Sequence, residues 1–217
     1  MFKYVIKTIS EISDEAYKKS FGCMNIDRQE KVKRIKNENQ KKCTLAGEWL
    51  VREMMAEITG KNPEHFIISA DEKGKLFCDN VPQIHFNISH SDNLVAVAVC
   101  DKPVGIDIES IRKVSLKLAK RVCTEKELEY VFDKIPDAED YISENPAYIK
   151  RFLEIWTIKE AYFKCIGTGI TDFQSVDAFD NKFKKTKVES DNYIMHIIKK
   201  CFEKHINPPV SAVRSGR

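Results

Sequence analysis

A chain of 217 residues is long enough for one large domain or two small lobes, and its 42% hydrophobic content indicates a globular protein. A net charge of only +3 argues against general nucleic-acid binding, and no apolar stretch approaches the roughly 18 residues of a membrane span, so we expect neither partner. Seven scattered cysteines without a CxxC pair suggest neither a disulfide framework nor a zinc site, and they indicate a reducing cytoplasm.

The first half of the chain is predicted to mix strands and helices. Residues 2–8 have the pattern of a strand, and Ser13 marks the start of the first helix. A short basic helix is predicted at about 27–37, and a longer helix from about residue 40 to its stop at Gly60. Further strands are predicted at 66–68, 84–88 and 94–99, with the polar segment Ser89–Asn93 linking the last two.

In the second half as well, the main helices are predicted to precede the last strands. Thr124 and Glu127 have the T-x-x-E spacing of a capping box, which opens a helix through about residue 133. A strong helix is predicted at 147–166, and the last strands at 173–179, 183–189 and 192–199. This order permits two similar lobes that meet near residue 103.

The run from Val104 to Glu109 alternates apolar and polar residues, as a half-buried strand does. Side chains on a strand point alternately to two faces, so Gly105, Asp107 and Glu109 share one face. Two adjacent carboxylates are unfavourable unless a cation lies between them, and such a pair suits Mg²⁺, which takes further ligands from a substrate phosphate. A solvated strand face would show the same alternation, so this pattern alone leaves both interpretations open.

A cluster of basic residues occupies residues 28–42. Its members are Arg28, Lys31, Lys33, Arg34, Lys36, Lys41 and Lys42. Basic clusters attract phosphates, whether on nucleic acid, a membrane or a nucleotide-like ligand. The same residues could equally form the solvated face of a helix.

The predicted helix at 147–166 has two features that break the pattern of an ordinary amphipathic helix. Lys159 falls inside the apolar stripe, where its charge needs a partner unless the side chain extends to water. Glu160 and Lys164 lie one turn apart at the edge of the stripe. They could form an ordinary surface ion pair. Alternatively, Glu160 could be a metal ligand and Lys164 a phosphate contact. Together with Asp107 and Glu109, these residues form a plausible frame for phosphoryl transfer.

Two motifs in this order resemble the paired signature of 4′-phosphopantetheinyl transferases. They are Gly105-Ile106-Asp107-Ile108-Glu109 and Trp156-Thr157-Ile158-Lys159-Glu160-Ala161. Three further stretches agree with the family: Thr44-Leu45-Ala46-Gly47, Gly74-Lys75 and Phe86-Asn87-Ile88-Ser89-His90-Ser91. The length resembles the Sfp-type enzymes, which carry both lobes in one chain, rather than the trimeric holo-acyl-carrier-protein synthases.

The resemblance implies an α+β fold of two similar lobes, each a small antiparallel sheet packed on helices. The expected division is a coenzyme A-binding lobe at 1–103, a magnesium-binding catalytic lobe at 104–206 and a tail at 207–217. The implied reaction is Mg²⁺-dependent. It transfers 4′-phosphopantetheine from coenzyme A to a serine of an apo acyl carrier or peptidyl carrier protein, and releases adenosine 3′,5′-bisphosphate. The implied enzyme is a cytoplasmic monomer that serves fatty-acid, polyketide or nonribosomal peptide biosynthesis.

The resemblance also assigns roles to individual residues. Asp107, Glu109 and Glu160 would hold Mg²⁺, and Glu160 would act as, or assist, the base that activates the serine. Lys159 and Lys164 would contact the pyrophosphate of coenzyme A and stabilise developing charge.

The remaining implied contacts are with the nucleotide part of coenzyme A. The expected 3′-phosphate contacts are Thr44 and His90, helped by Arg28 and Lys31. The expected contacts at the adenine end are Lys75 and Ser89.

Two other functions compete with an active transferase. A non-catalytic module that binds a carrier protein or coenzyme A would keep the fold and lose the chemistry, but all three carboxylates and both lysines are present. A nucleic-acid binder is suggested only by residues 28–42, which lack interleaved aromatic residues. For a transferase, we expect the carrier protein to contact the region after Glu109 and the segment 122–148.

Overall fold

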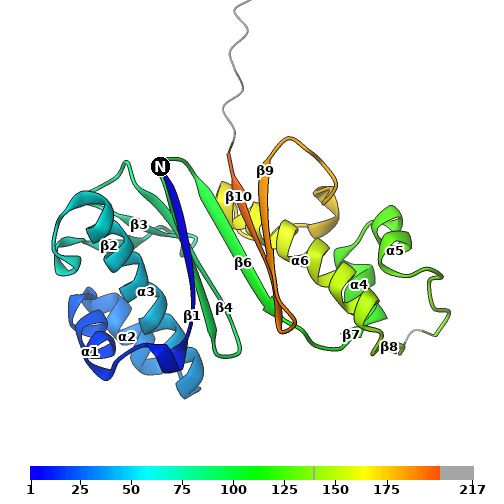
Figure 1. Cartoon of the computed structure of the whole chain (residues 1–217), viewed down its shortest axis with the longest axis horizontal. Helices are drawn as coiled ribbons and strands as arrows, with labels where there is room; N and C mark the ends of the chain where they lie inside the picture. Colours follow the sequence, from blue (N-terminus) through cyan, green and yellow to red (C-terminus); the bar gives the residue numbers. More distant parts are fainter. Residues whose placement is uncertain (139, 201–217) are drawn as a thin grey trace, which may run out of the picture.

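The computed structural model describes residues 1–138 and 140–200. The expected tail at 207–217, and the last residues of the expected catalytic lobe, lie outside this range. Figure 1 shows two lobes, each with a small sheet and one long helix. Within the described part of the chain, every helix is too short or too polar to cross a bilayer.

The N-terminal lobe contains a three-stranded antiparallel sheet in the order β1-β5-β4. Its long helix α3 lies against β5, and buried residues such as Leu50 and Met54 pack on Val97 and Val99. The elements of this lobe are β1 (Phe2–Thr8), η1 (Ile9–Glu11), α1 (Asp14–Cys23), α2 (Ile26–Arg34), α3 (Glu38–Thr59), η2 (Pro63–His65), β2 (Ile68–Ala70), β3 (Leu76–Cys78), β4 (His85–Ser91) and β5 (Leu94–Cys100).

The C-terminal lobe repeats this plan with the sheet order β6-β10-β9, also antiparallel. Helix α6 packs on β6 and β10 through a core that includes Phe152, Ile194 and Ile198. The elements are β6 (Val104–Ser110), β7 (Val114–Ser115), α4 (Leu116–Val122), α5 (Glu125–Val131), β8 (Ile142–Ser143), α6 (Pro146–Ile166), η3 (Phe173–Ser175), β9 (Lys184–Glu189) and β10 (Tyr193–Lys199).

The long helices of the two lobes begin and end alike. The side chains of Asn37 and Asn145 accept hydrogen bonds from the first turn of α3 and α6, respectively. Each helix ends at a glycine in the left-handed conformation, Gly60 with φ 70° and Gly167 with φ 73°. The α+β fold of two similar lobes is therefore confirmed, and the proposed boundary at residue 103 falls between β5 and β6.

The two sheets pack against each other through their inner faces, while the helices lie on the outer faces (Figure 1). Strand β5 is apolar on both sides because Val95, Val97 and Val99 face the core with α3, whereas Ala96 and Ala98 face the other sheet. On β6 the inner-facing residues include Ile106 and Ile108. A third core cluster thus joins the lobes.

Several predicted elements differ from the structure. The strand expected at 173–179 is wrong, because Phe173 serves as a core residue packed on Trp156 and begins the short helix η3. The polar link at Ser89–Asn93 is also too long, since β4 extends to Ser91. Only Asp92, with φ 50°, and Asn93 form the turn. Helix α4 was not predicted.

Strand β6 and helix α6 lie in very close contact at Gly105. A Cβ atom there would lie 2.0 Å from the carbonyl oxygen of Ala161 and 2.4 Å from the amide nitrogen of Cys165. These are backbone atoms, so neither can rotate away as a side chain could. Glycine in the Gly-Ile-Asp-Ile-Glu motif therefore allows α6 to lie directly against the strand.

We expect Gly105→Ala to lower the free energy of unfolding by about 3 kcal/mol, because the helix must move off the strand. The matched control is Gly22→Ala on α1, where an added Cβ meets nothing within 4 Å. That change should raise stability by up to about 1 kcal/mol. Urea unfolding followed by circular dichroism measures both, and equal stability of the Gly105→Ala protein and the wild type would contradict the close packing.

Candidate active site

The two lobes meet where β4 lies beside β6, and we call this contact the seam. Side chains of β4 hold it together. The backbone N–H groups of Ile106, Ile108 and Ser110 point away from β10, so they find no partner within their own sheet. They donate instead to Asn87 Oδ1 at 2.9 Å, Ser89 Oγ at 3.3 Å and Ser91 Oγ at 3.0 Å.

The two serines of the seam also hold the carboxylates of β6. Ser89 donates to Asp107 Oδ1 at 2.9 Å, and Ser91 donates to Glu109 Oε2 at 3.0 Å. Each serine thus accepts a hydrogen bond from the β6 backbone and donates one to a β6 carboxylate. The seam therefore fixes both the lobe contact and the orientation of the acidic pair.

Helix α6 brings a further carboxylate and an ammonium group to the same place. Lys164 Nζ lies 2.6 Å from Asp107 Oδ1 and 3.1 Å from Ser89 Oγ. It lies 3.6 Å from Glu160 Oε2, one turn back on the helix. The predicted convergence of Asp107, Glu109, Glu160 and Lys164 is therefore present in the structure.

Because the cluster is buried, its charged groups interact strongly and their pKa values shift. Loss of water raises the pKa of Asp107, and burial together with the Asp107 charge raises the pKa of Glu109. Burial and repulsion from Asp107 and Glu109 raise the pKa of Glu160 to about 7. Burial opposes the charge of Lys164, but Asp107 and Glu160 outweigh that effect and raise its pKa.

The chemistry of the cluster fits a divalent cation, although its side chains do not form a complete set of metal ligands. Within residues 1–138 and 140–200, no group of three or more His, Cys, Asp or Glu side chains stands ready as a ligand set. However, Asp107 Oδ2 is buried with no hydrogen-bond partner, and the carboxylates repel one another. A bound cation would satisfy that oxygen and relieve the repulsion, and carboxylate oxygens are ligands that Mg²⁺ accepts.

A pocket of about 390 Å³ lies between residues of both lobes and reaches this cluster through Lys164. The predicted residues Arg28, Thr44, Lys75 and His90 line it as well. Alternation along β4 explains the arrangement, because His90 points to the pocket side while Ser89 points to the seam. Burial and the nearby Lys164 charge lower the pKa of His90, which favours a neutral imidazole.

Comparison with known proteins decides the family. The family described as "4'-phosphopantetheinyl transferase superfamily" matches residues 103–207, and "4'-phosphopantetheinyl transferase, N-terminal" matches residues 11–102. The 4'-phosphopantetheinyl transferase Sfp of Bacillus subtilis (strain 168) is 30% identical over 161 residues, or 74% of this chain and 67% of that protein. This chain belongs to the 4′-phosphopantetheinyl transferase superfamily.

Two other relatives agree with the assignment. The 4'-phosphopantetheinyl transferase gsp of Aneurinibacillus migulanus is 32% identical over 165 residues, which cover 76% of this chain and 65% of the relative. HetI of Nostoc sp. is 31% identical over 138 residues, 61% of this chain and 54% of that protein. The chain thus spans about two thirds or less of the length of these relatives. The resemblance to the phosphopantetheinyl transferases, drawn from the motifs, and to their Sfp type, drawn from the chain length, is confirmed.

The structure corrects the roles expected of two residues of this phosphopantetheinyl transferase homologue. Lys159 is fully buried, and its ammonium group donates to Glu127 Oε2 at 2.6 Å and to the carbonyl oxygen of Val122 at 2.9 Å. A group enclosed in this way cannot contact a pyrophosphate, so that expectation is wrong. Ser89 was expected at the adenine end, but its hydroxyl is buried against Asp107.

Lys75 and Lys31, two other residues expected to contact coenzyme A, are not placed as simple ligand contacts. The ammonium group of Lys75 donates to the carbonyl oxygens of Lys164 at 2.7 Å and Cys165 at 3.0 Å, and burial lowers its pKa. It therefore ties the N-terminal lobe to the end of α6 while its stem lines the pocket. Lys31 is exposed on α2 and does not line the pocket.

Sequence reasoning missed the partners that hold these residues. The motif at residues 86–91 contains Asn87 and Ser91 but gives them no role, although polar residues at every second position of a strand are a signal for a polar edge. Glu127 was assigned only to a capping box, which it does form with Thr124. It also accepts from the amide of Ala178 and from Lys159, so it joins α5, α6 and the segment after η3.

We expect Lys159→Met to lower the free energy of unfolding by about 3–5 kcal/mol, because Glu127 would be left buried without its cation. Lys150→Met on the same helix removes a half-exposed ammonium and should change stability by less than about 0.5 kcal/mol. Chemical denaturation measures both. If the Lys159→Met protein were as stable as the wild type but bound coenzyme A more weakly, the result would instead support the pyrophosphate contact that the family resemblance implies for Lys159.

Proposed function

We propose that this chain transfers the 4′-phosphopantetheine group of coenzyme A to a serine hydroxyl of an apo acyl carrier or peptidyl carrier protein. The observation that carries the proposal is the meeting of Asp107, Glu109, Glu160 and Lys164 at the end of a cationic pocket. Coenzyme A combines a nucleotide with a pyrophosphate, which suits a pocket of this charge beside an acidic cluster. The proposed functional lobes are residues 1–103 and 104–206.

Mg²⁺ would be held by Asp107, Glu109 and Glu160, and when bound it neutralises charge on the pyrophosphate. The chain's own residues then have distinct tasks. Arg28, His90 and Thr44 line the part of the pocket proposed for the nucleotide. Lys164 lies where it can oppose the negative charge that develops on the leaving phosphate.

Glu160 is the proposed proton acceptor. The serine oxygen forms a bond to the phosphorus of the phosphopantetheine arm, and the bond from that phosphorus to the adenosine bisphosphate breaks. The serine proton passes to Glu160, directly or through water, and adenosine 3′,5′-bisphosphate leaves. Burial and the neighbouring carboxylates set the pKa of Glu160 at about 7, and a bound Mg²⁺ would lower it, so the carboxylate form that accepts the proton would predominate near neutral pH.

The carrier protein is proposed to approach from the side of the C-terminal lobe. The region after Glu109 includes Arg112, whose guanidinium pairs with Glu109 at 3.1 Å and is largely exposed. The segment 122–148 includes α5, where Tyr130 is exposed. A cytoplasmic monomer that modifies carrier proteins of fatty-acid, polyketide or nonribosomal peptide synthesis fits these proposals.

We expect Asp107→Asn to reduce transfer by about 100-fold or more, because it removes one charge from the cluster while keeping the side-chain shape. Intact mass spectrometry of an apo carrier protein incubated with the enzyme, Mg²⁺ and coenzyme A measures the product. The matched control is Asp191→Asn, the same change at an exposed residue of the β9–β10 turn, which should leave transfer unchanged.

Normal turnover by the Asp107→Asn protein would refute the proposed metal ligand. The competing function, a module that binds without catalysis, predicts a different result for the wild type. It would bind coenzyme A in a calorimeter and never add the phosphopantetheine mass to any apo carrier protein.

A further inference from the structure

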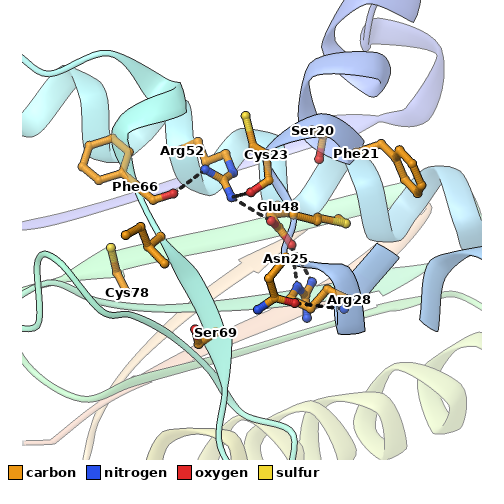
Figure 2. Close-up of polar contacts among 12 residues, drawn as sticks. Ser20, Phe21, Cys23, Asn25, Arg28, Glu48, Arg52, Phe66, Ser69 and Cys78 are labelled. Carbon is orange, nitrogen blue, oxygen red and sulfur yellow. Dashed lines mark hydrogen bonds and ion pairs between the residues drawn. The ribbon is translucent and has the colours of Figure 1, made fainter. Parts of the chain in front are cut away.

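A buried carboxylate lies in the middle of α3, away from the acidic cluster. Glu48 has no exposed surface, and Figure 2 shows its side chain between two arginines. Its Oε2 accepts from Arg28 Nε at 2.9 Å and Nη2 at 2.5 Å, and its Oε1 accepts from Arg52 Nη2 at 3.0 Å. Both oxygens of the carboxylate are therefore occupied by guanidinium groups.

Arg52 holds Glu48 in place from the buried side. It is fully buried and one turn after Glu48 on α3. Its Nη1 donates to the carbonyl oxygen of Phe66 at 2.6 Å, and its Nη2 donates to that of Cys23 at 3.1 Å (Figure 2). Since the partners are backbone atoms at the ends of α1 and η2, Arg52 holds Glu48 in a fixed position.

Of Arg28, Glu48 and Arg52, only Arg28 reaches solvent, with 12% of its side chain exposed. It lies on α2, where its amide donates to the capping side chain of Asn25, and it lines the pocket. Two guanidinium groups share one carboxylate, so one positive charge is in excess. Because Arg52 is enclosed, that charge is available to a ligand only through Arg28.

The geometry also leaves Arg28 free to bind an anion. Glu48 takes its Nε and one Nη2 hydrogen, and no other side-chain partner of Arg28 occurs among the described residues. The remaining N–H donors can bind a phosphate at a fixed angle, since the guanidinium is planar. Orienting a long side chain in advance reduces the entropy lost when the ligand binds.

We propose that Glu48, supported by Arg52, is a positioning residue that fixes Arg28 for the 3′-phosphate of the nucleotide and so sets the preference for nucleotides that carry it. This inference rests on the proposed function, because coenzyme A has two separate anionic groups. Lys164 and the carboxylate cluster suit the pyrophosphate, and the proposed function assigns Arg28, with Thr44 and His90, to the nucleotide part of the same pocket, which carries the monoester.

The test is calorimetric binding of adenosine 3′,5′-bisphosphate and of adenosine 5′-monophosphate to the full chain. These nucleotides differ only in the 3′-phosphate, and binding needs no transfer, so the result is independent of whether the chain is active. A charge-assisted contact corresponds to about 10-fold or more in affinity, so the wild type should prefer the bisphosphate by at least about that factor. Glu48→Gln should remove most of the preference and leave the affinity for the monophosphate unchanged.

Glu48→Gln leaves Arg52 without its carboxylate and can unfold the chain, so Glu48→Asp is the second variant. It keeps the buried charge but is one methylene shorter, and it should reduce the preference to an intermediate value. The control on the same helix is Glu57→Gln, whose exposed carboxylate pairs with Lys3, and it should bind as the wild type does.

A double-mutant cycle completes the test. Arg28→Ala should abolish the preference, and adding Glu48→Gln to it should cause no further loss, because Glu48 acts through Arg28. A wild-type preference in any folded Glu48 variant would overturn the proposal. Equal weakening of both nucleotides would also overturn it, since a purely structural role predicts that result.

Discussion

The interaction on which this structure depends is the set of hydrogen bonds from β4 side chains to the β6 backbone. An unpaired strand edge buried between two sheets would leave N–H groups without partners, at a substantial cost in free energy. Asn87, Ser89 and Ser91 supply acceptors in place of another strand. The sheets therefore meet without merging, and the seam can carry polar chemistry.

The same bonds explain why the acidic cluster is both buried and ordered. Ser89 and Ser91 each satisfy a backbone amide and then donate to Asp107 or Glu109. Gly105 lets α6 pack against the strand, which brings Glu160 and Lys164 to the carboxylates. The three carboxylates repel one another, and Lys164 offsets only part of that repulsion. Such a cost is typical of sites that are built to bind a cation and an anion together.

Buried charged pairs serve a different purpose in each lobe. Lys159 and Glu127 are both fully enclosed and join elements of the C-terminal lobe, with no route to a ligand. Glu48 and Arg52 are enclosed in the same way, but their network extends to Arg28 at the pocket. Exposure of one member therefore separates a structural ion pair from one that can position a ligand contact.

Much of the fold follows from local patterns, because helix periodicity and caps depend on residues close in sequence. The helices starting after Asn37 and Asn145, and most strands, were predicted in this way. Residues 173–179 were misread because Phe173 is apolar for packing on Trp156 rather than for a sheet.

The site was predictable where a motif places residues on regular elements, as for Asp107 and Glu160. It was not predictable where the partner comes from a distant segment. The apolar stripe of α6 shows that Lys159 is buried, but not that Glu127 receives its charge. The periodicity of α3 likewise does not reveal that Glu48 binds Arg28 across to α2.

Amide hydrogen exchange of β6, measured by NMR on the wild type and on Asn87→Ala, tests directly whether β4 side chains hold the β6 backbone. We expect slow exchange at Ile106, Ile108 and Ser110 in the wild type, because side chains of β4 accept these hydrogen bonds. Asn87→Ala should accelerate exchange at Ile106 while the β6 amides that pair with β10 stay protected. If all three amides of the wild type exchanged as fast as exposed amides, the side chains of β4 would not hold this edge of β6.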